Sequence, residues 1–340
     1  MSSTTDTPAP EVGAATGTQG ASRTRRLSMS DGALQTLLLF AFLVLIAAYF
    51  TSQDSDFLST RNGLNILVNV GVIGIVSMGQ LLALISGGFD LSVGGIVPLG
   101  AVTFALLVNA GYSVPTALLV VIAFGAVCGV VNGLLIAKAR INPLIATLGT
   151  LSVTGGLALT LADGVQVPFE DVTDGILTRR SLFDINNHVW IFLGLALVMF
   201  AVLRYTSYGR QLYAVGGNKQ AARLAGIRVD LVTISVYVIS GALAALAGAV
   251  LASQLLTGSG TAGTGSGLQS ITAVILGGAS LSGGVGGVPG TLIGVLILGA
   301  LSNGMAILTV PSFYQTMATG AVLLLAVGIS QFRSSRRSAS

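Results

Sequence analysis

The residues most capable of chemistry in this chain lie in one glycine-flanked stretch, residues 87–95, which reads G-G-F-D-L-S-V-G-G. Asp90 is the only charged residue between Arg61 and Lys138, and long apolar runs lie on both sides of it. A carboxylate at the centre of a membrane helix costs about 2.5–3.5 kcal/mol on insertion scales, so such groups usually face a bundle interior or a water-filled path. The glycines give the backbone a freedom that a continuous helix does not need. The stretch therefore predicts a broken or re-entrant helix beside a translocation path.

A simpler interpretation is that Asp90 caps the helix that follows it. Either Asp90 or Ser92 could accept hydrogen bonds from the free N–H groups at the start of that helix. The two interpretations are compatible, and the sequence leaves both open.

The motifs of several enzyme and metal-protein classes are absent from the sequence. No G-x-x-x-x-G-K-[ST] phosphate loop occurs, so the chain does not bind ATP by that route, and no H-E-x-x-H motif occurs. Cys128 and His188 are the only residues of their types, which excludes an internal disulfide and a Cys/His metal cluster. The sequence predicts a protein that is not an enzyme and has no metal or cofactor of its own.

The composition is that of a membrane protein. Hydrophobic residues make up 53% of the 340 residues and charged residues 8%, with a mean hydropathy of +0.88, whereas a soluble domain carries about 25% charged residues. The 46 glycines favour close approach between transmembrane helices. We therefore expect an all-α polytopic protein whose main partner is the lipid bilayer, and the modest net charge of +4 indicates no nucleic-acid partner.

Three regions follow from the distribution of residue types. Residues 1–30 are rich in Ser, Thr, Ala, Pro and Gly for most of their length, which predicts a disordered cytoplasmic tail. Residues 31–332 form the expected transmembrane domain, and residues 333–340 form a basic cytoplasmic tail. Arginines just before the first apolar run, without an A-x-A cleavage site after it, favour a start-transfer helix over a signal peptide.

About 20 apolar residues span a bilayer as a helix. On that basis the sequence predicts about ten transmembrane helices, some of them broken or re-entrant at glycine-rich points, with both termini on one side. The expected ranges are 33–50, 64–86, 94–110, 115–137, 144–162, 189–205, 230–252, 266–282, 288–306 and 313–331.

The distribution of basic residues agrees with ten spans. If the N-terminus is cytoplasmic, 13 of the 16 basic residues lie in cytoplasmic segments, and the exterior keeps only Arg61, Arg179 and Arg180. Nine or eleven spans would place the basic C-terminal cluster outside, against the positive-inside rule. Both termini are therefore expected in the cytoplasm.

Two long loops stand out. The exterior loop, about residues 163–188, carries five acidic residues and is long enough to form a cap or a docking surface, although a plain solvated loop explains it as well. The cytoplasmic loop, about residues 206–229, contains N-K-Q-A-A-R-L-A-G. Asn218 can cap a short helix there and Gly226 can end it. The alternative is an interfacial helix whose basic residues reach the lipid headgroups.

A weak internal repeat joins two glycine-rich points. G-G-F-D-L-S-V-G at residues 87–94 aligns with G-G-A-S-L-S-G-G at residues 277–284, and a proline follows each copy. Paired glycine-rich interruptions in two halves of a chain often mark the path of a transporter. A Gly/Ser-rich composition also produces such repeats by chance.

Several separated motifs together resemble those of one family, the permeases of bacterial ABC importers of the ribose/xylose/arabinose/galactose type. G-G-F-D-L-S-V-G-G is similar to the family's G-G-I-D-L-S-V-G signature, with Phe89 in place of Ile. N-P-L-I-A-T-L-G-T (142–150), G-R-Q-L-Y-A-V-G-G-N-K-Q-A-A-R-L-A-G-I (209–227), T-A-G-T-G-S-G-L-Q-S-I-T-A-V-I-L-G-G (261–278) and P-G-T-L-I-G-V-L-I-L-G (289–299) also match, in the family's order. The resemblance covers residues 57–331, most of the chain.

The resemblance implies a multi-pass permease of the bacterial plasma membrane that works with partners. Two permease copies, a homodimer or a pair with a related chain, surround a central path, and separate ATP-binding cassette subunits hold the ATP and magnesium. An extracytoplasmic binding protein delivers a monosaccharide or related polyol. The short cytoplasmic helix resembles the element that docks on the ATPase, although Gln220 stands where Glu is common; the implied docking residues are Gly217, Asn218, Gln220, Ala221, Ala222, Arg223 and Gly226.

A sugar path should present hydrogen-bonding groups within apolar runs. The candidates are Asp90, Ser92, Gln80, Asn69, Gln269 and Asn303. Each amide could instead join two helices by a hydrogen bond worth about 0.6–2 kcal/mol, and we favour that role for Asn69 and Asn132. On the outside, Arg61, Arg179 and Arg180 are candidates for docking the binding protein, or for weak ion pairs within the loop.

Two rival functions remain open. A secondary active transporter would use Asp90 to couple an ion, but it does not explain the cytoplasmic alanine-rich helix. A channel-like protein predicts ungated flux and no partner. The sequence does not identify the sugar.

Overall fold

The chain is predominantly helical and forms a bundle. The computed structural model describes residues 31–170, 177 and 179–338; the predicted tail at residues 1–30 and the last two residues of the basic tail lie outside them. The α-helices are α1 (Asp31–Gln53), α2 (Thr60–Ile85), α3 (Val93–Asn109), α4 (Val114–Ala137), α5 (Pro143–Leu161), α6 (Asn187–Tyr205), α7 (Ser207–Gly217), α8 (Lys219–Leu224), α9 (Val229–Leu255), α10 (Ser266–Leu276), α11 (Val288–Ile307) and α12 (Ser312–Ser338). Two short 3₁₀-helices, η1 (Ser55–Leu58) and η2 (Leu182–Asp184), complete the helical elements of the described residues.

An all-α protein was expected, and the structure departs from this at one place. Strands β1 (Val167–Pro168) and β2 (Thr257–Gly258) form a two-stranded antiparallel ladder that pairs Val167 with Gly258. The ladder joins the loop after α5 to the end of α9. It is too short to change the fold class, but it fixes the position of Val167 and Pro168 at the described start of the longest loop.

A helix lies at each of the ten ranges expected to span the membrane, but the helices differ in length. Seven are long and apolar enough to cross a bilayer: α1, α2, α4, α5, α6, α9 and α11. The apolar parts of α3, α10 and α12 are shorter. The expected helix at 266–282 is wrong in its second half, because α10 ends at Leu276 and the glycine-rich residues that follow form turns.

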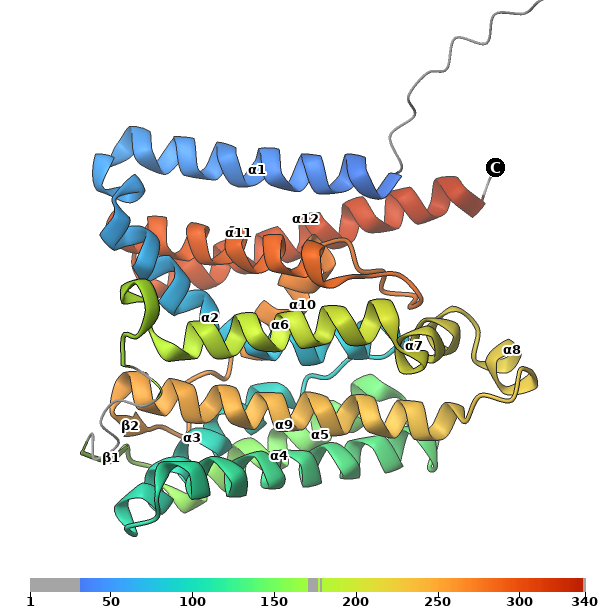
Figure 1. Ribbon diagram of the computed structural model, residues 1–340, viewed down its shortest axis with the longest axis horizontal. Coiled ribbons are helices and arrows are strands. Elements are labelled where there is room, and N and C mark those ends of the chain that lie inside the picture. The colour runs from blue at the N-terminus through green and yellow to red at the C-terminus, as the bar shows by residue number, and fades with distance from the viewer. Residues whose placement is uncertain (1–30, 171–176, 178, 339–340) are drawn as a thin grey trace, which may run out of the picture.

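The two ends of the bundle carry different elements (Figure 1). The start of α1, the end of α12 and the pair α7–α8 lie at one end, which we call the α8 end. The 3₁₀-helix η1 and strands β1 and β2 lie at the opposite end, which we call the strand end. The described ends of the chain therefore lie on the same side of the bundle.

The core lies around α2 and α9. Most of the second half of α2 is completely buried, as is Tyr237 in α9. The closest helix packing is between α4 and α9, where Gly125, Gly129 and Gly133 repeat at every fourth residue of α4. A Cβ atom at Gly129 would contact the carbonyl oxygen of Tyr237, so only glycine allows the two backbones to approach this closely.

Substitution Gly129→Ala is therefore expected to destabilise the protein by about 1–3 kcal/mol, because the added methyl group meets a rigid backbone. The matched control is Gly194→Ala in α6, where no atom lies within 4 Å of an added Cβ. Thermal unfolding of the two purified variants in detergent measures the difference. A midpoint for Gly129→Ala equal to that of Gly194→Ala would contradict the packing described here.

Candidate functional site

A chain of buried polar side chains holds the segment between α2 and α3. Asp90 is completely buried, and its Oδ1 atom accepts hydrogen bonds from the Ser92 hydroxyl and, at 3.1 Å, from the Ser92 backbone N–H. The Asn132 amide on α4 donates to Ser92 Oγ at 2.8 Å, and the Thr150 hydroxyl on α5 donates to Asn132 Oδ1 at 2.6 Å. Four groups from three parts of the chain thus form one polar chain inside the bundle.

The polar chain confirms one interpretation of the sequence and corrects another. Ser92 is the N-cap residue of α3 and makes no side-chain capping hydrogen bond, and Asp90 accepts from the N–H of Ser92 itself, so Asp90 closes a turn before α3 instead of capping the helix. Asn132 joins α4 to the Asp90 segment and to α5 by hydrogen bonds, as expected for a residue that joins helices. The Tyr237 hydroxyl on α9 adds a further contact, because it donates to the Phe89 carbonyl oxygen at 3.2 Å.

Some buried polar atoms near the bundle centre have no partner within the described residues. They are both side-chain atoms of Gln80 and the Ser77 hydroxyl; Asp90 Oδ2 and the Ser240 hydroxyl make no well-formed hydrogen bond either, but Ser240 lies beside the Asp90 carboxyl group. Gln80 and Ser77 lie one turn apart on α2, and Ser240 packs against Gly79 of the same helix. Leaving such a group unpaired costs about 1–3 kcal/mol, so the interior of this protein keeps polar groups that stability alone does not require.

The two glycine-rich repeats meet each other at the α8 end. The Gly284 N–H donates to the Ile85 carbonyl oxygen at 2.9 Å, which joins the second repeat to the last turn of α2. Both Gly87 and Gly283 have positive φ, +76° and +86°, which glycine adopts without strain. The internal repeat is therefore also a contact in space.

Helix α7 packs directly on this glycine junction. A Cβ atom at Gly216 would collide with the Ile85 carbonyl oxygen and lie 2.6 Å from the Gly284 nitrogen. The Tyr213 hydroxyl donates to the Gly286 carbonyl oxygen at 2.8 Å. Burial raises the pKa of Tyr213, so its hydroxyl keeps its proton and remains a donor. Movement of α7 must therefore displace both glycine-rich segments.

The expected short helix in the cytoplasmic loop is present as α8. Asn218 Oδ1 accepts from the N–H groups of Gln220 and Ala221 at 2.9 and 3.0 Å, and Gly226, with φ +81°, follows the helix. Ala222 is buried, whereas Leu224 leaves 91% of its surface exposed. Ala222 therefore lies on the packed side of α8 and Leu224 on its open side.

Sequence reasoning missed two features of this loop. It did not predict α7, although apolar residues at 208, 212 and 215 follow a helical spacing and Thr206 caps the helix through Gly209 N–H at 3.2 Å. It also missed Asp230, whose carboxylate bonds Lys138 at 2.9 Å and Arg223 at 3.1 Å. Asp230 is the only acidic residue after Asp184, which is the signal that could have identified it.

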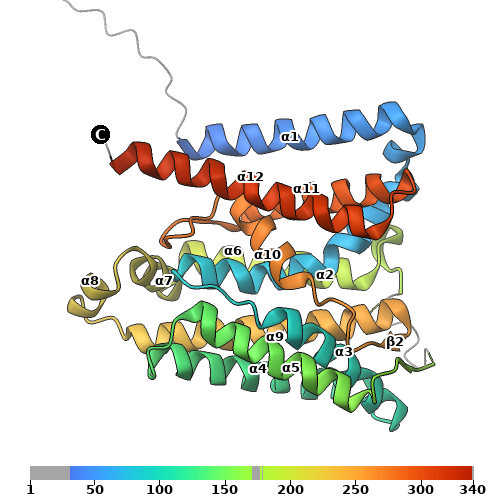
Figure 2. The same ribbon diagram turned by 180° about the vertical axis from the view of Figure 1, so that it is seen from behind.

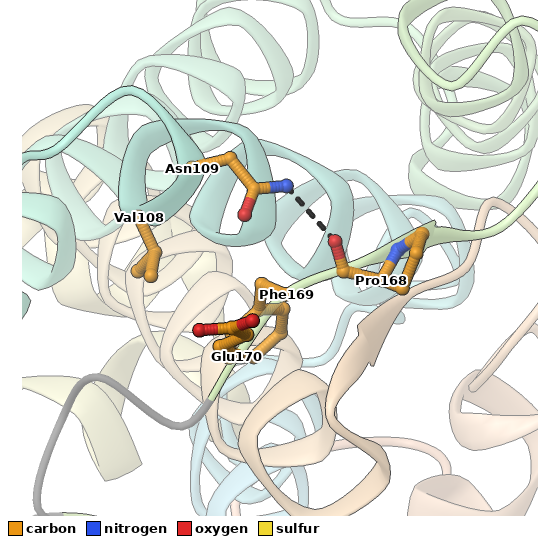
Figure 3. Close-up of a pocket in the computed structure, with 5 residues that line it drawn as sticks. All are labelled: Val108, Asn109, Pro168, Phe169 and Glu170. Atoms are coloured by element: carbon orange, nitrogen blue, oxygen red, sulfur yellow. Dashed lines mark hydrogen bonds between the residues drawn. The ribbon is translucent and has the colours of Figure 1, made fainter.

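The strand end holds the exterior loop in place. Asn109 donates to the Pro168 carbonyl oxygen at 2.9 Å beside an open pocket that Val108, Phe169 and Glu170 also line (Figure 3). The Phe169 ring packs edge-on against Phe104 of α3, at 5.9 Å between ring centres. The described start of this loop is therefore packed on the bundle.

His188, which the sequence excluded only as a metal ligand, joins the same loop to three helices. It lies at the start of α6 with Nδ1 3.3 Å from the Leu177 carbonyl oxygen and Nε2 2.9 Å from Gln254 Nε2 of α9. The ring also packs against Gly71 of α2. His188 Nε2 also lies 3.2 Å from the Val68 carbonyl oxygen of α2, so the ring meets hydrogen-bonding groups of α2, of α9 and of the loop.

The structure places the predicted path residues in two environments. Asp90, Ser92 and Gln80 are enclosed, and Asn303 is largely buried with its Oδ1 2.9 Å from Asn62 Nδ2. Gln269 and Asn69 are exposed. The path assignment of all six residues stays a prediction.

The predicted docking arginines lie at the strand end. Arg61 is in the first turn of α2, Arg179 and Arg180 shortly precede α6, and all three are exposed. They are thus on the opposite end of the bundle from α8 (Figure 1). No group of three or more His, Cys, Asp or Glu residues that could hold a metal ion occurs among the described residues.

Comparison with known proteins gives a consistent result. Residues 62–327 match the family described as branched-chain amino acid transport system / permease component. The ribose import permease protein RbsC of Bacillus subtilis (strain 168) is 38% identical over 306 residues, which cover 89% of this chain and 95% of that protein. The L-arabinose ABC transporter permease protein AraH of Azospirillum brasilense is 38% identical over 302 residues, covering 89% of both chains. No solved structure matches the chain.

The polar chain yields a test with a matched control. Substitution Asn132→Leu leaves the Ser92 and Thr150 hydroxyls without their partner, at an expected cost of about 1–3 kcal/mol. Substitution Asn69→Leu, at an exposed amide with no hydrogen bond to another described residue, should leave the unfolding temperature unchanged or raise it slightly. Thermal unfolding in detergent compares the two, and equal unfolding temperatures would show that the polar chain does not stabilise the fold.

Proposed function

The chain belongs to the family described as branched-chain amino acid transport system / permease component, and we propose that it is the membrane-spanning permease subunit of an ABC importer that translocates a monosaccharide or related polyol. The single observation that carries the proposal is its 38% identity, over about nine tenths of the chain, to permeases named for ribose and for L-arabinose. It resides in the bacterial plasma membrane as a multi-pass protein. Its own sequence supplies no ATP-binding motif, so ATP and magnesium bind to a separate ATPase subunit.

Sugar is preferred over a branched-chain amino acid as the substrate, although the family description names the latter. The similar relatives with specific names are sugar permeases. The candidate path residues are uncharged amides and hydroxyls with one enclosed carboxylate, which suit a substrate made of hydroxyl groups. A zwitterionic amino acid would require charged partners at its two ionised ends.

We assign the α8 end to the cytoplasm and the strand end to the exterior, with ten crossings and both termini inside. The α8 end carries Lys138, Arg210, Lys219 and Arg223, as the positive-inside rule requires. Helix α10 has 11 residues and is about 16 Å long, about half of the hydrocarbon thickness. It therefore crosses only together with the non-helical chain on either side of it.

Helix α8 docks on the ATPase, and α7 carries the motion inward. The exposed surface of α8 includes Ala221 and Leu224, while Ala222 faces the bundle. The ion pair between Asp230 of α9 and Arg223 of α8 connects the two helices. A rigid-body displacement of α8 passes to α7 and through Gly216 to both glycine-rich segments. This supports a role in alternating access for the docking residues predicted from the sequence.

A second permease copy and an extracytoplasmic binding protein complete the importer. Arg61, Arg179 and Arg180 are exposed at the strand end, and we infer that they contact carboxylates of the binding protein. A second copy of this chain, forming a homodimer, is the simplest partner across the path. The same surfaces would serve a related permease.

The function is tested by ATPase activity in proteoliposomes that contain this chain, its ATPase subunit and a binding protein loaded with ribose or arabinose. The loaded binding protein should raise the ATPase rate. Substitution Leu224→Glu should abolish that rise and weaken co-purification of the ATPase, because a carboxylate cannot enter an apolar contact without losing its hydration.

Leu182→Glu is the matched control, since Leu182 is 65% exposed but lies in η2 at the strand end. It should leave co-purification of the ATPase unchanged. An equal loss of ATPase in both variants would point to general damage, and full activity of Leu224→Glu would remove α8 from the docking contact.

Asp90 acts in this proposal as an anchor and not as an ion-coupling group. Asp90→Asn keeps the Oδ1 acceptor for Ser92, and the amide nitrogen that replaces Oδ2 can donate to the neighbouring Ser240 hydroxyl. ATP-driven uptake by Asp90→Asn should therefore stay within about threefold of the parent, equivalent to about 0.7 kcal/mol, whereas Asp90→Leu should lose both uptake and thermal stability. Uptake that is driven by a proton or sodium gradient and abolished in Asp90→Asn would support secondary transport instead.

A further inference from the structure

The non-helical segment between β2 and α10 runs along α3 toward the centre of the bundle. Gly258 lies against Ala101 and Ala105 of α3, Gly263 lies against Val97, and the Thr264 carbonyl oxygen would lie 2.8 Å from a Cβ at Gly94. These contacts follow α3 backwards, from its middle to its first turn. The segment therefore enters the bundle from the strand end, antiparallel to α3.

The depth of this segment follows from the length of α3. Asn109, the last residue of α3, lies at the strand end beside Pro168. Gly94 is fifteen residues earlier, which at 1.5 Å per residue places it about 22 Å from that end. A hydrocarbon core is about 30 Å thick. Thr264 therefore lies deep within the membrane.

The segment is exposed at that depth. Thr261, Thr264 and Gly265 have no regular secondary structure and are exposed, and Leu268 and Gln269 in the first turn of α10 are exposed as well. Only the Gln269 amide comes within 4 Å of an added Cβ at Gly265. The side-chain amide of Gln269 makes no hydrogen bond to another described residue, whereas its backbone N–H donates to the Gly265 carbonyl oxygen at 3.1 Å. One side of the segment packs on α3, and the other is open.

Lipid cannot cover this open side. Non-helical backbone does not face hydrocarbon, because its N–H and C=O groups would lose their hydrogen bonds; it occurs only inside protein or beside water. The exposed amide of Gln269 adds to that cost. Figure 2 shows α10 in the middle of this face, with α12 on one side and α5 on the other.

Helix α5 extends the same surface with small polar residues. Gly260 packs on Leu159 of α5: a Cβ atom added at Gly260 would lie 2.9 Å from the Cδ2 atom of Leu159. Ser152 lies seven residues before Leu159, so it is on the same side of the helix, and it is exposed. Gly149 and Gly156 have no atom within 4 Å of an added Cβ. The surface beside the segment is therefore uncharged and open, and it mixes small and hydroxyl residues with exposed leucines such as Leu148 and Leu159.

We propose that residues 259–269, with Ser152 of α5, form one wall of the water-filled sugar path, and that the second permease copy forms the opposite wall. This inference rests on the proposed function. It assigns sugar contact in this conformation to Thr264 and Gln269 and leaves Asp90 behind the wall as an anchor. Hydroxyl, amide and exposed backbone groups can form weak hydrogen bonds with a sugar, which lets the sugar pass along the path.

Reaction of introduced cysteines with a water-soluble, membrane-impermeant methanethiosulfonate tests this assignment. The reagent attacks only the thiolate, which forms in water and not in hydrocarbon. The parent carries Cys128→Ser, so each variant has one thiol. Variants Thr264→Cys, Gln269→Cys and Leu268→Cys are compared with Leu197→Cys. Leu197 is 69% exposed and belongs to α6, a helix that lies in front in Figure 1 and behind in Figure 2. Leu268 and Leu197 are matched in residue type and exposure.

The complex of permease, ATPase and binding protein is labelled in proteoliposomes, with and without ATP. At least one state should label the cysteines at 264, 268 and 269 at least about tenfold faster than Leu197→Cys. Labelling as slow as that of Leu197→Cys in every state would overturn the inference. Slow labelling with disulfide cross-linking between copies would show a dry contact between subunits, which also overturns it. ATP-driven uptake by the Cys128→Ser parent, measured in the same vesicles, tests the proposed function separately.

Discussion

Unpaired backbone groups cannot face hydrocarbon, and this constraint governs the whole structure. Three non-helical segments each adjoin one of the shorter helices: residues 86–92 precede α3, and residues 259–265 and 277–287 flank α10. Each must be covered by protein or by water. The hydrogen-bonded side chains of Asp90, Ser92, Asn132 and Thr150 enclose the first segment. The Tyr237 hydroxyl adds a further contact to it. Tyr213 and Gly216 of α7 cover part of the third segment, at the α8 end, where Ser282 and Val285 stay exposed. The second is covered on one side only, which is why it is the place for a path.

The coverage of these segments also connects them. The first and third segments touch at Gly87 and Gly283, and Gly216 of α7 lies against both. Because all three residues are glycines, the backbones of the two segments and of α7 touch directly. A displacement of α7 therefore reaches the segments without side-chain rotamer changes in between. The polar chain then ties the first segment to α4 and α5, and α5 is part of the face beside the second segment. A displacement that starts at α8 therefore has a continuous route of packed contacts to the proposed path.

The sequence predicted the elements whose signals are local. Asp90 among glycines indicated a broken helix, and Asn218 with Gly226 indicated the ends of α8, because capping depends on residues a few positions apart. Asn132 was identified as a residue that joins helices, but its partners, 40 and 18 residues away, follow only from the fold. Helix α7 was missed because its three glycines lower helix propensity, and the need for Gly216 appears only when Ile85 and Gly284 are seen beside it. Likewise, sequence could mark Asp90 and Gln269 as polar residues in apolar runs, but not that one is enclosed and the other open.

An electron cryomicroscopy map of the complete importer in a lipid nanodisc would test the central claim most directly, that the half-covered face lines a path between two permease copies. The account predicts a second copy opposite residues 259–269, a water-filled gap beside Gln269 and the ATPase against α8. Ordered lipid along α5, α10 and α12, with the second copy packed against α1 or α6, would contradict it.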